Sequence, residues 1–351
     1  MTLQTIADAV GVSRMTVSNA FSRPDQLSAE LRDRILSTAT RLGYTGPDPS
    51  ARALAKGAVG TIGLMLTDRW ERAFSDEIAT RLLAAISEEL GASGRGLTLL
   101  GSSSDGTFVP SRDVPLDGAL VYSCGANSEA VEFLVRRRLP LVFLDQRPVE
   151  GFPSLNIDDR GGATAAARHL VELGHRRVAL ITKVDAPLGL LADWRRADAP
   201  FTSWSRLEGW AAGLAEAGID PIVVVNADDS SEAAGRQAAQ PLLGMAPGHR
   251  PTAVLAYSDR IAQGVIEAAH DAGLDVPADL SVVGFDDADF SARTRPTLTT
   301  VHQDVARKGH EATALLLEAI ARRAPQHTDH RVLPTELVVR GSTAPPPLEP
   351  R

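Results

Sequence analysis

The sequence has 351 residues, of which 44% are hydrophobic and 23% are charged, the composition of an ordinary folded globular protein. A single hydrophobic core seldom organises a chain of this length, so we expect two or three domains. No apolar run approaches the roughly 18 residues that cross a bilayer, and the first residues lack the basic and apolar regions of a secretory signal. The sequence therefore predicts a cytoplasmic protein that does not bind membranes.

Charge and cysteine content narrow the possible classes further. Residues 1–58 carry seven Lys/Arg and five Asp/Glu, a net charge of +2, whereas the rest of the chain has a net charge of −10. A mildly basic end on an acidic body is typical of a small anion-binding head. The lone Cys124 can form no intrachain disulfide and lies in no group of metal ligands, so we expect no metal and no cofactor.

Residues 1–45 predict a head of three short helices. Apolar residues recur at helical spacing before Gly11, which ends the first helix, and Ser13 is a candidate N-cap for the second. Ser28 is a candidate N-cap for the third helix. Glycine and two prolines then predict a linker that continues into a short helical segment, together residues 46–58.

Residues 59–343 predict a two-lobed α/β body. Short apolar runs alternate with helical stretches, which is the pattern of doubly wound parallel sheets, and the series occurs twice. The expected strands are 62–66, 97–100, 119–122, 141–144, 178–181, 222–225, 253–256, 281–285 and 336–339. Two such sheets form a cleft where the carboxyl ends of their strands face each other, and ligands bind there. We expect the Pro-rich tail, residues 344–351, to be disordered.

The first two predicted helices form a helix–turn–helix, which places the second helix in a DNA major groove. Arg14 is suited to guanine O6 and N7, and Met15 to a thymine methyl, while the nearby hydroxyls suit phosphate oxygens. The predicted DNA contacts in this segment are Ser13, Arg14, Met15, Thr16, Ser18 and Asn19. The helix pattern alone fits equally well a small three-helix bundle with no nucleic-acid role.

At these residues the chain resembles the lactose-repressor (LacI/GalR) family of bacterial transcription regulators. The motifs that carry the resemblance run from Thr2–Gln4 through Leu54–Gly57 and continue at Asn156–Asp158, His169–His175, Arg206–Trp210, Ser281–Asp287 and Leu298–Val301. They cover residues 1 to about 343. The resemblance implies a helix–turn–helix head on a periplasmic-binding-protein-like body. It also implies a homodimer that binds a near-palindromic operator, usually as a repressor, and responds to a small effector.

The resemblance also implies a role for the short helical segment after the head. Paired across the dimer, two such helices fold over the minor groove, where Leu54 wedges into the central base step. Arg52 and Lys56 are expected to lie on phosphates. The alternative is that Leu54 packs on the head or the body. The segment Gly46–Pro49 is longer than the usual linker, which leaves the registration of this helix open.

In the family, polar residues at the ends of strands grip the effector. The matching polar residues here are Asp145, Arg206, Ser258 and Asp286, and Phe74 is an apolar candidate for the same site. An arginine with several carboxylates suits the hydroxyls of a sugar, because charge-assisted hydrogen bonds are short and strong. Phe74 is expected to open a helix and supply an apolar wall, and Arg206 to open another helix. For Asp259 and Asp287 we expect an N-cap rather than a ligand contact.

The cleft departs from the family pattern at one point. Sugar-responsive members often carry an aromatic ring near Ser230, where this chain has two aspartates. The stretch Leu188–Ser205 is longer than usual, and its Trp194 or Trp204 is a candidate for the missing ring. A sugar is the expected effector, with a nucleoside or another polyol as alternatives. Cys124 either lines this cleft or fills apolar space.

Two other classes of protein are weighed against a regulator. An enzyme is disfavoured because the sequence has no Walker loop, no run of metal ligands and no Gly-x-Ser-x-Gly elbow. The adjacent Asp286 and Asp287 also point apart and make a poor acid–base pair. A transporter-type solute-binding protein shares the two-lobed body, but it needs an export signal and has no use for residues 1–57.

Overall fold

The computed structural model describes residues 1–46, 48, 53, 57–66, 73–74, 76–101, 109–123, 128–196, 199–322 and 329–347. The chain forms two compact units. One comprises Met1–Gly60 with Pro115–Asp117, and the other comprises Thr61–Val114 with Gly118–Arg351. We refer to the helical part of the first unit as the head and to the second unit as the body.

The head contains the three expected helices, α1 (Leu3–Val10), α2 (Arg14–Ser22) and α3 (Ala29–Arg41), and one 3-10 turn at Pro24–Gln26. A serine or threonine hydroxyl caps each of the three helices by accepting a hydrogen bond from a backbone N–H of the first turn. Gly11 turns the chain between α1 and α2 with a φ of 76°, a conformation that glycine adopts without strain. The buried core of the head consists of Ile6, Ala7, Val17, Ala20, Ile35 and Ala39.

The first lobe of the body is built on a parallel sheet with the strand order β12-β5-β4-β3-β1-β2. The strands are β1 (Thr61–Leu66), β2 (Gly96–Leu100), β3 (Gly118–Tyr122), β4 (Leu141–Leu144), β5 (Ser154–Ile157) and β12 (His330–Leu333). The helices of this lobe are α6 (Glu77–Ala92), α7 (Pro110–Asp113), α8 (Glu129–Arg136) and α13 (Val305–Arg322). Every residue of β4 and β5 is buried, as expected for central strands covered on both faces.

The second lobe has the strand order β10-β9-β6-β8-β7, parallel except for the edge strand β7. Its strands are β6 (Val178–Thr182), β7 (Gly189–Leu190), β8 (Val223–Asn226), β9 (Ala253–Ala256) and β10 (Ser281–Val283). Its helices are α9 (Asp159–Glu172), α10 (Phe201–Ala215), α11 (Glu232–Leu243) and α12 (Asp259–Asp271). Part of the long Leu188–Ser205 stretch thus forms an edge strand.

Two helix pairs of the second lobe pack unusually closely. A Cβ at Gly209 of α10 would lie 2.4 Å from the carbonyl oxygen of Arg160 in α9. A Cβ at Gly264 of α12 would lie 2.1 Å from the carbonyl oxygen of Glu232 in α11. Only glycine permits these approaches, because it has no Cβ atom to hold the two helices further apart.

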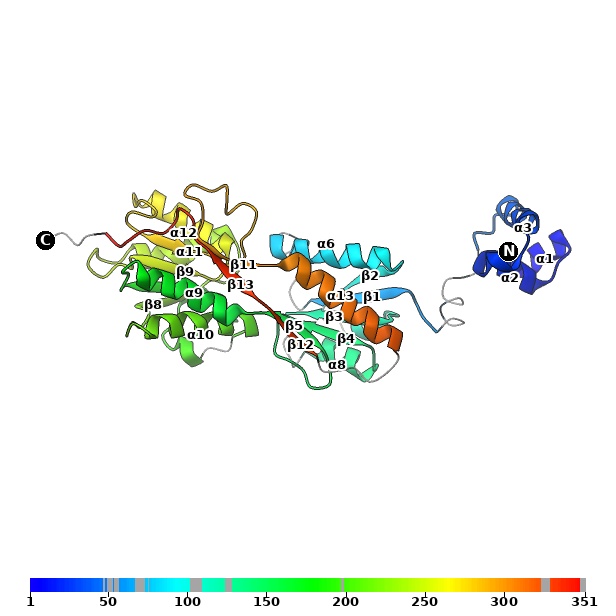
Figure 1. The fold of residues 1–351 in the computed structure, drawn as a ribbon, viewed down its shortest axis with the longest axis horizontal. Helices are drawn as coiled ribbons and strands as arrows, with labels where there is room; N and C mark the ends of the chain where they lie inside the picture. The colour runs from blue at the N-terminus through cyan, green and yellow to red at the C-terminus, as the bar shows by residue number, and fades with distance from the viewer. Residues whose placement is uncertain are drawn as a thin grey trace. The chain divides into compact units, whose positions relative to one another are not determined.

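The chain passes between the lobes three times. After β5 it enters α9, after β10 it returns to α13, and after β12 it crosses to the C-terminal segment. Two of these passages pair as an antiparallel ribbon of β11 (Thr300–Gln303) and β13 (Thr335–Val338), which Figure 1 shows between the lobes. The late helix α13 packs against the early helix α6, orange beside cyan in Figure 1. Neither lobe is therefore a continuous stretch of sequence.

The expected C-terminal disorder is wrong for residues 344–347. Ser342 is fully buried and its hydroxyl hydrogen-bonds Val282 in β10. The Ala344 carbonyl accepts a hydrogen bond from Nε2 of His175 at 2.9 Å, and the Ala344 backbone N–H donates to the Ser281 hydroxyl at 3.0 Å. The segment is fixed because its backbone polar groups find buried partners in the second lobe.

The expected strands all occur, with boundaries shifted by at most two residues. Elements β5, β7, β11, β12, α7 and α13 were not predicted from the sequence. Among the described helices, none is both long enough and apolar enough to cross a bilayer.

Candidate functional site

The exposed surface of α2 presents most of the predicted DNA contacts. Arg14 is exposed, and 69% of the Met15 surface is exposed although methionine is apolar. Thr16, Ser18 and Asn19 are partly exposed. The Nδ2 of Asn19 donates a hydrogen bond to Oε1 of Gln26 at 3.2 Å, so this side chain also holds the turn that follows α2.

Ser13 has a structural role in addition to the predicted one. Its hydroxyl caps α2 by accepting a hydrogen bond from the Thr16 backbone N–H at 3.0 Å. The Ser13 and Thr16 hydroxyls lie 2.8 Å apart and are hydrogen-bonded to each other. These groups sit at the N-terminus of α2, where the helix dipole favours phosphate. The other predicted DNA contacts, Arg52, Leu54 and Lys56, lie outside the described residues.

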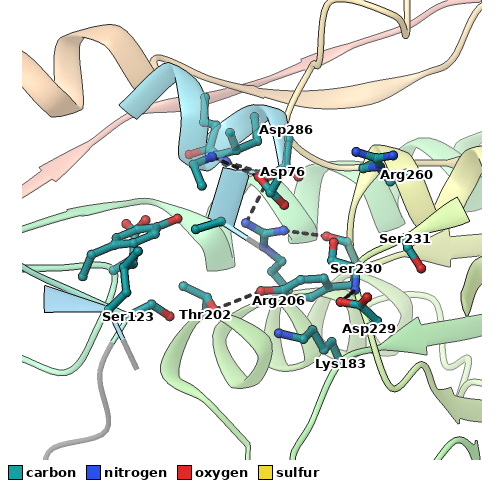
Figure 2. Close-up of a pocket in the computed structure, with 18 residues that line it drawn as sticks. Asp76, Ser123, Lys183, Thr202, Arg206, Asp229, Ser230, Ser231, Arg260 and Asp286 are labelled. Carbon is teal, nitrogen blue, oxygen red and sulfur yellow. Dashed lines mark hydrogen bonds and ion pairs between the residues drawn. The ribbon is translucent and has the colours of Figure 1, made fainter. Parts of the chain in front are cut away.

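The body contains a cavity of about 190 Å³ with walls from both lobes. Its lining includes Leu66, Ala73, Asp76, Ile78, Ala79, Tyr122, Ser123 and Asp145 from the first lobe, Lys183, Thr202, Arg206, Asp229, Ser230, Ser231, Tyr257, Arg260 and Asp286 from the second, and Gln303 from the ribbon. Figure 2 shows Arg206 near the middle of these side chains, with Asp286 above it and Lys183 below it. The predicted residues Asp145, Arg206 and Asp286 thus come together around one cavity.

Arg206 is the most heavily engaged side chain of the cavity. It lies within α10 rather than at its start, and only 4% of its surface is exposed. Its guanidinium donates to Oδ1 of Asp159 at 2.8 Å and to the Tyr257 carbonyl at 2.5 Å, and it lies 3.5 Å from Oδ1 of Asp286. The Phe285 ring packs against the same group, with its centroid 3.6 Å from Cζ. These contacts fix the arginine in one orientation.

Burial is the largest influence on the pKa values of Arg206 and of the two carboxyl groups that face it. It raises the pKa of Asp159 to about 6, although the positive charge of Arg206 favours the ionised carboxylate. Burial also raises the pKa of Asp286 well above its ordinary value, again against the effect of Arg206. For Arg206, burial lowers the pKa, but the facing carboxylates of Asp159 and Asp286 outweigh this and raise it. Arg206 is therefore a permanent cation between two acids that are costly to ionise.

A second buried ion pair lies on the first-lobe side. The Nζ of Lys308 in α13 is 2.5 Å from Oδ2 of Asp145 and donates to Oε1 of Gln303 at 3.1 Å. The Nε2 of Gln303 donates to Oδ1 of Asp286 at 2.7 Å. Gln303 thus connects the carboxylate–lysine pair of the first lobe with the arginine cluster of the second. A continuous chain of polar contacts crosses between the lobes beside the cavity.

Sequence reasoning missed Lys308, although a signal was present. Val305, Ala312, Leu315 and Leu316 form the buried face of α13, and Lys308 stands on the same face at helical spacing. A charged residue in an apolar stripe needs a partner of opposite charge. The pattern indicates a buried ion pair but cannot identify Asp145, which is 163 residues away in sequence.

Backbone strain gathers at the cavity. The lining residues Ser123, Asp145 and Asp286 have φ values of 50°, 50° and 113°, which are sparsely populated by residues other than glycine. Each follows a strand of the parallel sheets, as ligand-binding residues of such folds do. Strained residues of this kind concentrate at functional sites, where the surrounding structure holds them in place.

Two predicted effector residues lie outside the described lining. Phe74 precedes α6 instead of opening it, and 57% of its surface is exposed. Ser258 is buried as the N-cap of α12, where its hydroxyl accepts from the Ile261 N–H at 3.3 Å. The same hydroxyl lies 2.8 Å from that of the lining residue Ser230, so Ser258 reaches the cavity only through Ser230.

The N-cap roles expected for two aspartates are wrong. Asp259 is the first residue of α12, one position after the cap, and its carboxylate accepts hydrogen bonds from the hydroxyls of Thr300 and Ser291. Asp287 caps no described helix, and its carboxylate pairs with Arg340 at 2.6 Å. Asp259 thus anchors the loop after β10 through Ser291 and the Ala288 N–H, and Asp287 joins this loop to Arg340.

The aromatic rings at the cavity are not the expected tryptophans. Trp194 is buried in the hydrophobic core with Trp210, and Arg195 stacks on it with Cζ 4.4 Å from the ring centroid. Trp204 lies outside the described lining. Tyr122 and Tyr257 supply the rings instead. Cys124 lies outside the described residues, so its expected place remains a prediction.

Comparison with known proteins identifies the family. Residues 2–47 match the model for bacterial regulatory proteins of the lacI family, and residues 167–343 match a periplasmic binding protein-like domain. An HTH-type transcriptional regulator of Mycolicibacterium smegmatis is 37% identical over 362 residues, which cover 99% of this chain and 97% of the relative. The chain belongs to the LacI family of transcriptional regulators.

Solved structures of LacI-family proteins share the architecture. The lac repressor dimer bound to operator and the anti-inducer ONPF superposes with a TM-score of 0.80 at 26% identity, covering 98% of this chain and 99% of that one. The transcriptional regulator CelR in complex with cellobiose has a TM-score of 0.69 at 25% identity, covering 97% and 99%. This chain is thus a helix–turn–helix regulator with the two-lobed body of its family.

Proposed function

We propose that this LacI-family regulator is a repressor that binds a near-palindromic operator as a homodimer and is controlled by a small polar effector, most simply a sugar. The observation that carries the proposal is the presence, in one chain, of an exposed helix–turn–helix surface and a polar cavity between two lobes. The lac repressor dimer bound to operator is a structural neighbour of the whole chain, which supports the dimer.

On the DNA side, we assign sequence reading to the N-terminal end of α2. Arg14 pairs with a guanine and Met15 contacts a thymine methyl in the major groove. Ser13, Thr16, Ser18 and Asn19 place the helix on the backbone, with Arg52, Leu54 and Lys56 of the linker acting at the centre of the operator. One such head buries too little DNA for tight specific binding, so two are required.

On the effector side, the proposal rests on Arg206, Asp286 and Asp145. Hydroxyl groups bind well between guanidinium and carboxylate groups because each hydroxyl both donates and accepts. The rings of Tyr122 and Tyr257 offer apolar faces for the ring carbons of a sugar. Ser258 acts through Ser230, and nothing in the described contacts supports a role for Phe74.

Control follows from the placement of these residues on different lobes. Asp145 comes from the first lobe and Arg206 from the second, so a bound effector favours one angle between the lobes. Such differential affinity is what shifts a conformational equilibrium. The marginal linker helices respond to the new spacing between subunits by folding or unfolding. A regulator that acts on chromosomal operators in this way works in the cytoplasm.

The proposal is tested by two titrations, one of the protein with operator DNA and one of the protein–operator complex with candidate effectors. Selection from a random double-stranded DNA pool is expected to return two half-sites about one helical turn apart. Fluorescence anisotropy on that operator then measures binding by the wild type and by Arg206→Ala, and a screen of sugars, polyols and nucleosides supplies effectors. We expect Arg206→Ala to keep operator binding and to lose the effector response.

The control variant is Arg168→Ala, which removes an exposed arginine paired with Glu216 on the outer side of α9 and α10. It is expected to behave as the wild type in both titrations. A full effector response from Arg206→Ala would overturn the cavity assignment. Absence of specific DNA binding would instead favour a solute-binding protein, and chemical turnover of a bound sugar would favour an enzyme.

A further inference from the structure

Buried carboxylates outnumber buried cations in the charged cluster beside the cavity, of which Asp145, Arg206 and Asp286 belong to the described lining. Asp145, Asp159 and Asp286 are at most 8% exposed, and so are Arg206 and Lys308, which face them. If all five groups are ionised, this cluster carries a net charge of −1, and with one acid protonated its net charge is zero. In neither state does it offer excess positive charge to a buried anion, which is costly without a partner.

Much of the donor capacity of the two cations is already used by the protein. Lys308 donates to Asp145 and Gln303, and the guanidinium of Arg206 is flanked by Asp159 and Asp286. The rest of the lining does not reverse the balance. Asp76 and Asp229 accompany Lys183 and Arg260, and Arg260 lies 3.8 Å from Glu232.

Two buried carboxylate oxygens of this cluster, Oδ1 of Asp145 and Oδ2 of Asp159, have no hydrogen-bond partner among the described residues, and of the two residues Asp145 is the one in the described lining. The other oxygen of the Asp145 carboxylate, Oδ2, holds Lys308. Asp145 lines the cavity and its side chain is 93% buried. A buried carboxylate oxygen without a partner is costly, so it marks a place where a hydrogen-bond donor belongs.

We propose, on the basis of the function proposed above, that the effector is a neutral, hydroxyl-rich molecule that donates a hydrogen bond to Oδ1 of Asp145. Lys308 is the positioning residue that holds this carboxylate for the effector. Phosphorylated or carboxylated compounds are rejected. A hydroxyl satisfies the orphan oxygen without adding charge. A phosphate or carboxylate at the same place meets three buried acids and brings no donor when ionised. Lys308 confers this selectivity because it anchors one oxygen and leaves the other for the effector.

The first experiment separates ligands by charge. Small metabolites extracted from bacterial cells are divided on an anion exchanger into an unretained neutral fraction and a retained anionic fraction. Each is tested for its effect on the anisotropy of the protein–operator complex. Matched pairs are tested in parallel, namely ribose with ribose 5-phosphate, glucose with glucose 6-phosphate, and adenosine with adenosine monophosphate.

We expect the neutral fraction to change operator affinity and the anionic fraction to have no effect. Within a matched pair, the phosphate ester is expected to bind at least 100-fold more weakly than the neutral compound. Activity confined to the anionic fraction, or a phosphate ester that binds as well as its neutral partner, would overturn this inference and leave effector control intact. If neither fraction affects an operator complex that does form, effector control itself fails.

A second experiment tests the positioning role with the neutral compound that binds most tightly in the matched panel. Asp145→Asn is expected to weaken its binding at least tenfold in calorimetry. Lys308→Met removes the donor that fixes Oδ2 of Asp145, so it should also weaken binding of this compound at least tenfold, whereas Lys308→Arg keeps a cationic donor and should retain most of the affinity. A Lys308→Met protein with wild-type affinity would contradict the role. If Lys308→Met does not fold, the Asp145→Asn result decides the proposal alone.

Discussion

The Nζ of Lys308 lies 2.5 Å from Oδ2 of Asp145 and joins helix α13 to the end of strand β4 inside the first lobe. Removing one member of a buried pair leaves an uncompensated charge, which costs about 3–5 kcal/mol. We therefore expect Lys308→Met to lower the free energy of unfolding by about that amount in urea denaturation. The double variant Lys308→Met/Asp145→Asn should recover much of the loss, because no charge is left behind.

The exposed pair of Arg168 and Glu216 provides the comparison for this experiment. Arg168→Met should leave the urea midpoint almost unchanged, because water screens both charges. Equal destabilisation by the two single variants, or a double variant no more stable than Lys308→Met, would show that the buried pair is not the source of the effect.

The N-cap of α2 allows its structural and DNA-binding roles to be separated. Ser13→Ala should destabilise the head by about 1 kcal/mol, seen as faster amide hydrogen exchange in residues 14–17 of the full chain. Ser13→Asp restores the cap but places a negative charge toward phosphate, so it should keep slow exchange and lose at least tenfold in operator affinity. Ser28→Asp makes the same change at the N-cap of α3 and is the control. Equal loss from both aspartates would remove Ser13 from the DNA contacts.

The pKa of Asp159 predicts how stability depends on pH. Burial raises this pKa from 3.8 to about 6, so between these values the folded state holds a proton that the unfolded state has released. The contribution of Asp159 to stability is thus present at low pH and is lost as the pH rises from about 4 to about 6, by about 3 kcal/mol at most. Asp159→Asn should flatten this part of the urea-stability profile. A slope identical to that of the wild type would contradict the assignment.

The close approach of helices α9 and α10 at Gly209 gives a fourth prediction. Gly209→Ala forces a methyl group against the Arg160 carbonyl and should cost about 1–3 kcal/mol of stability. Gly91→Ala in α6 meets nothing within 4 Å and should stabilise the protein by about 0.4–1 kcal/mol. Urea denaturation of both variants checks the pair. A neutral Gly209→Ala would mean that the helices separate freely.

Much of the fold is predictable because its central strands are buried on both faces. Such strands appear in the sequence as uninterrupted apolar runs, as at Leu141–Leu144. Strand β5 escapes this rule because two of its four buried residues are polar. Ser154 hydrogen-bonds His330, and Asn156 donates to the Gln146 carbonyl. Because these hydrogen-bond partners lie in a distant strand or in a turn, the local sequence does not show that Ser154 and Asn156 are buried.

The site was predictable where one residue type has one chemical use. Arg206 and Asp286 line the cavity, as expected from their places in the sequence, and their contact with an effector stays a prediction. Ser258, predicted as an effector contact, is the N-cap of α12, and Asp259, predicted as a cap, holds Thr300 and Ser291 instead. Either side chain can cap a helix, and only the backbone shows which one does. Lys308 depends on a contact between two lobe elements, and the spacing of residues along one helix cannot reveal it.

The threefold passage of the chain between the lobes has a consequence for biosynthesis. The first lobe begins at β1 but is closed by α13 and β12, which lie beyond residue 304. Helix α13 packs on β3, β4 and β5, so these strands stay partly uncovered until the ribosome has made nearly the whole protein. The second lobe, by contrast, has its whole sheet by residue 283. During translation the C-terminal half of the body can therefore mature before the half that the ribosome began first.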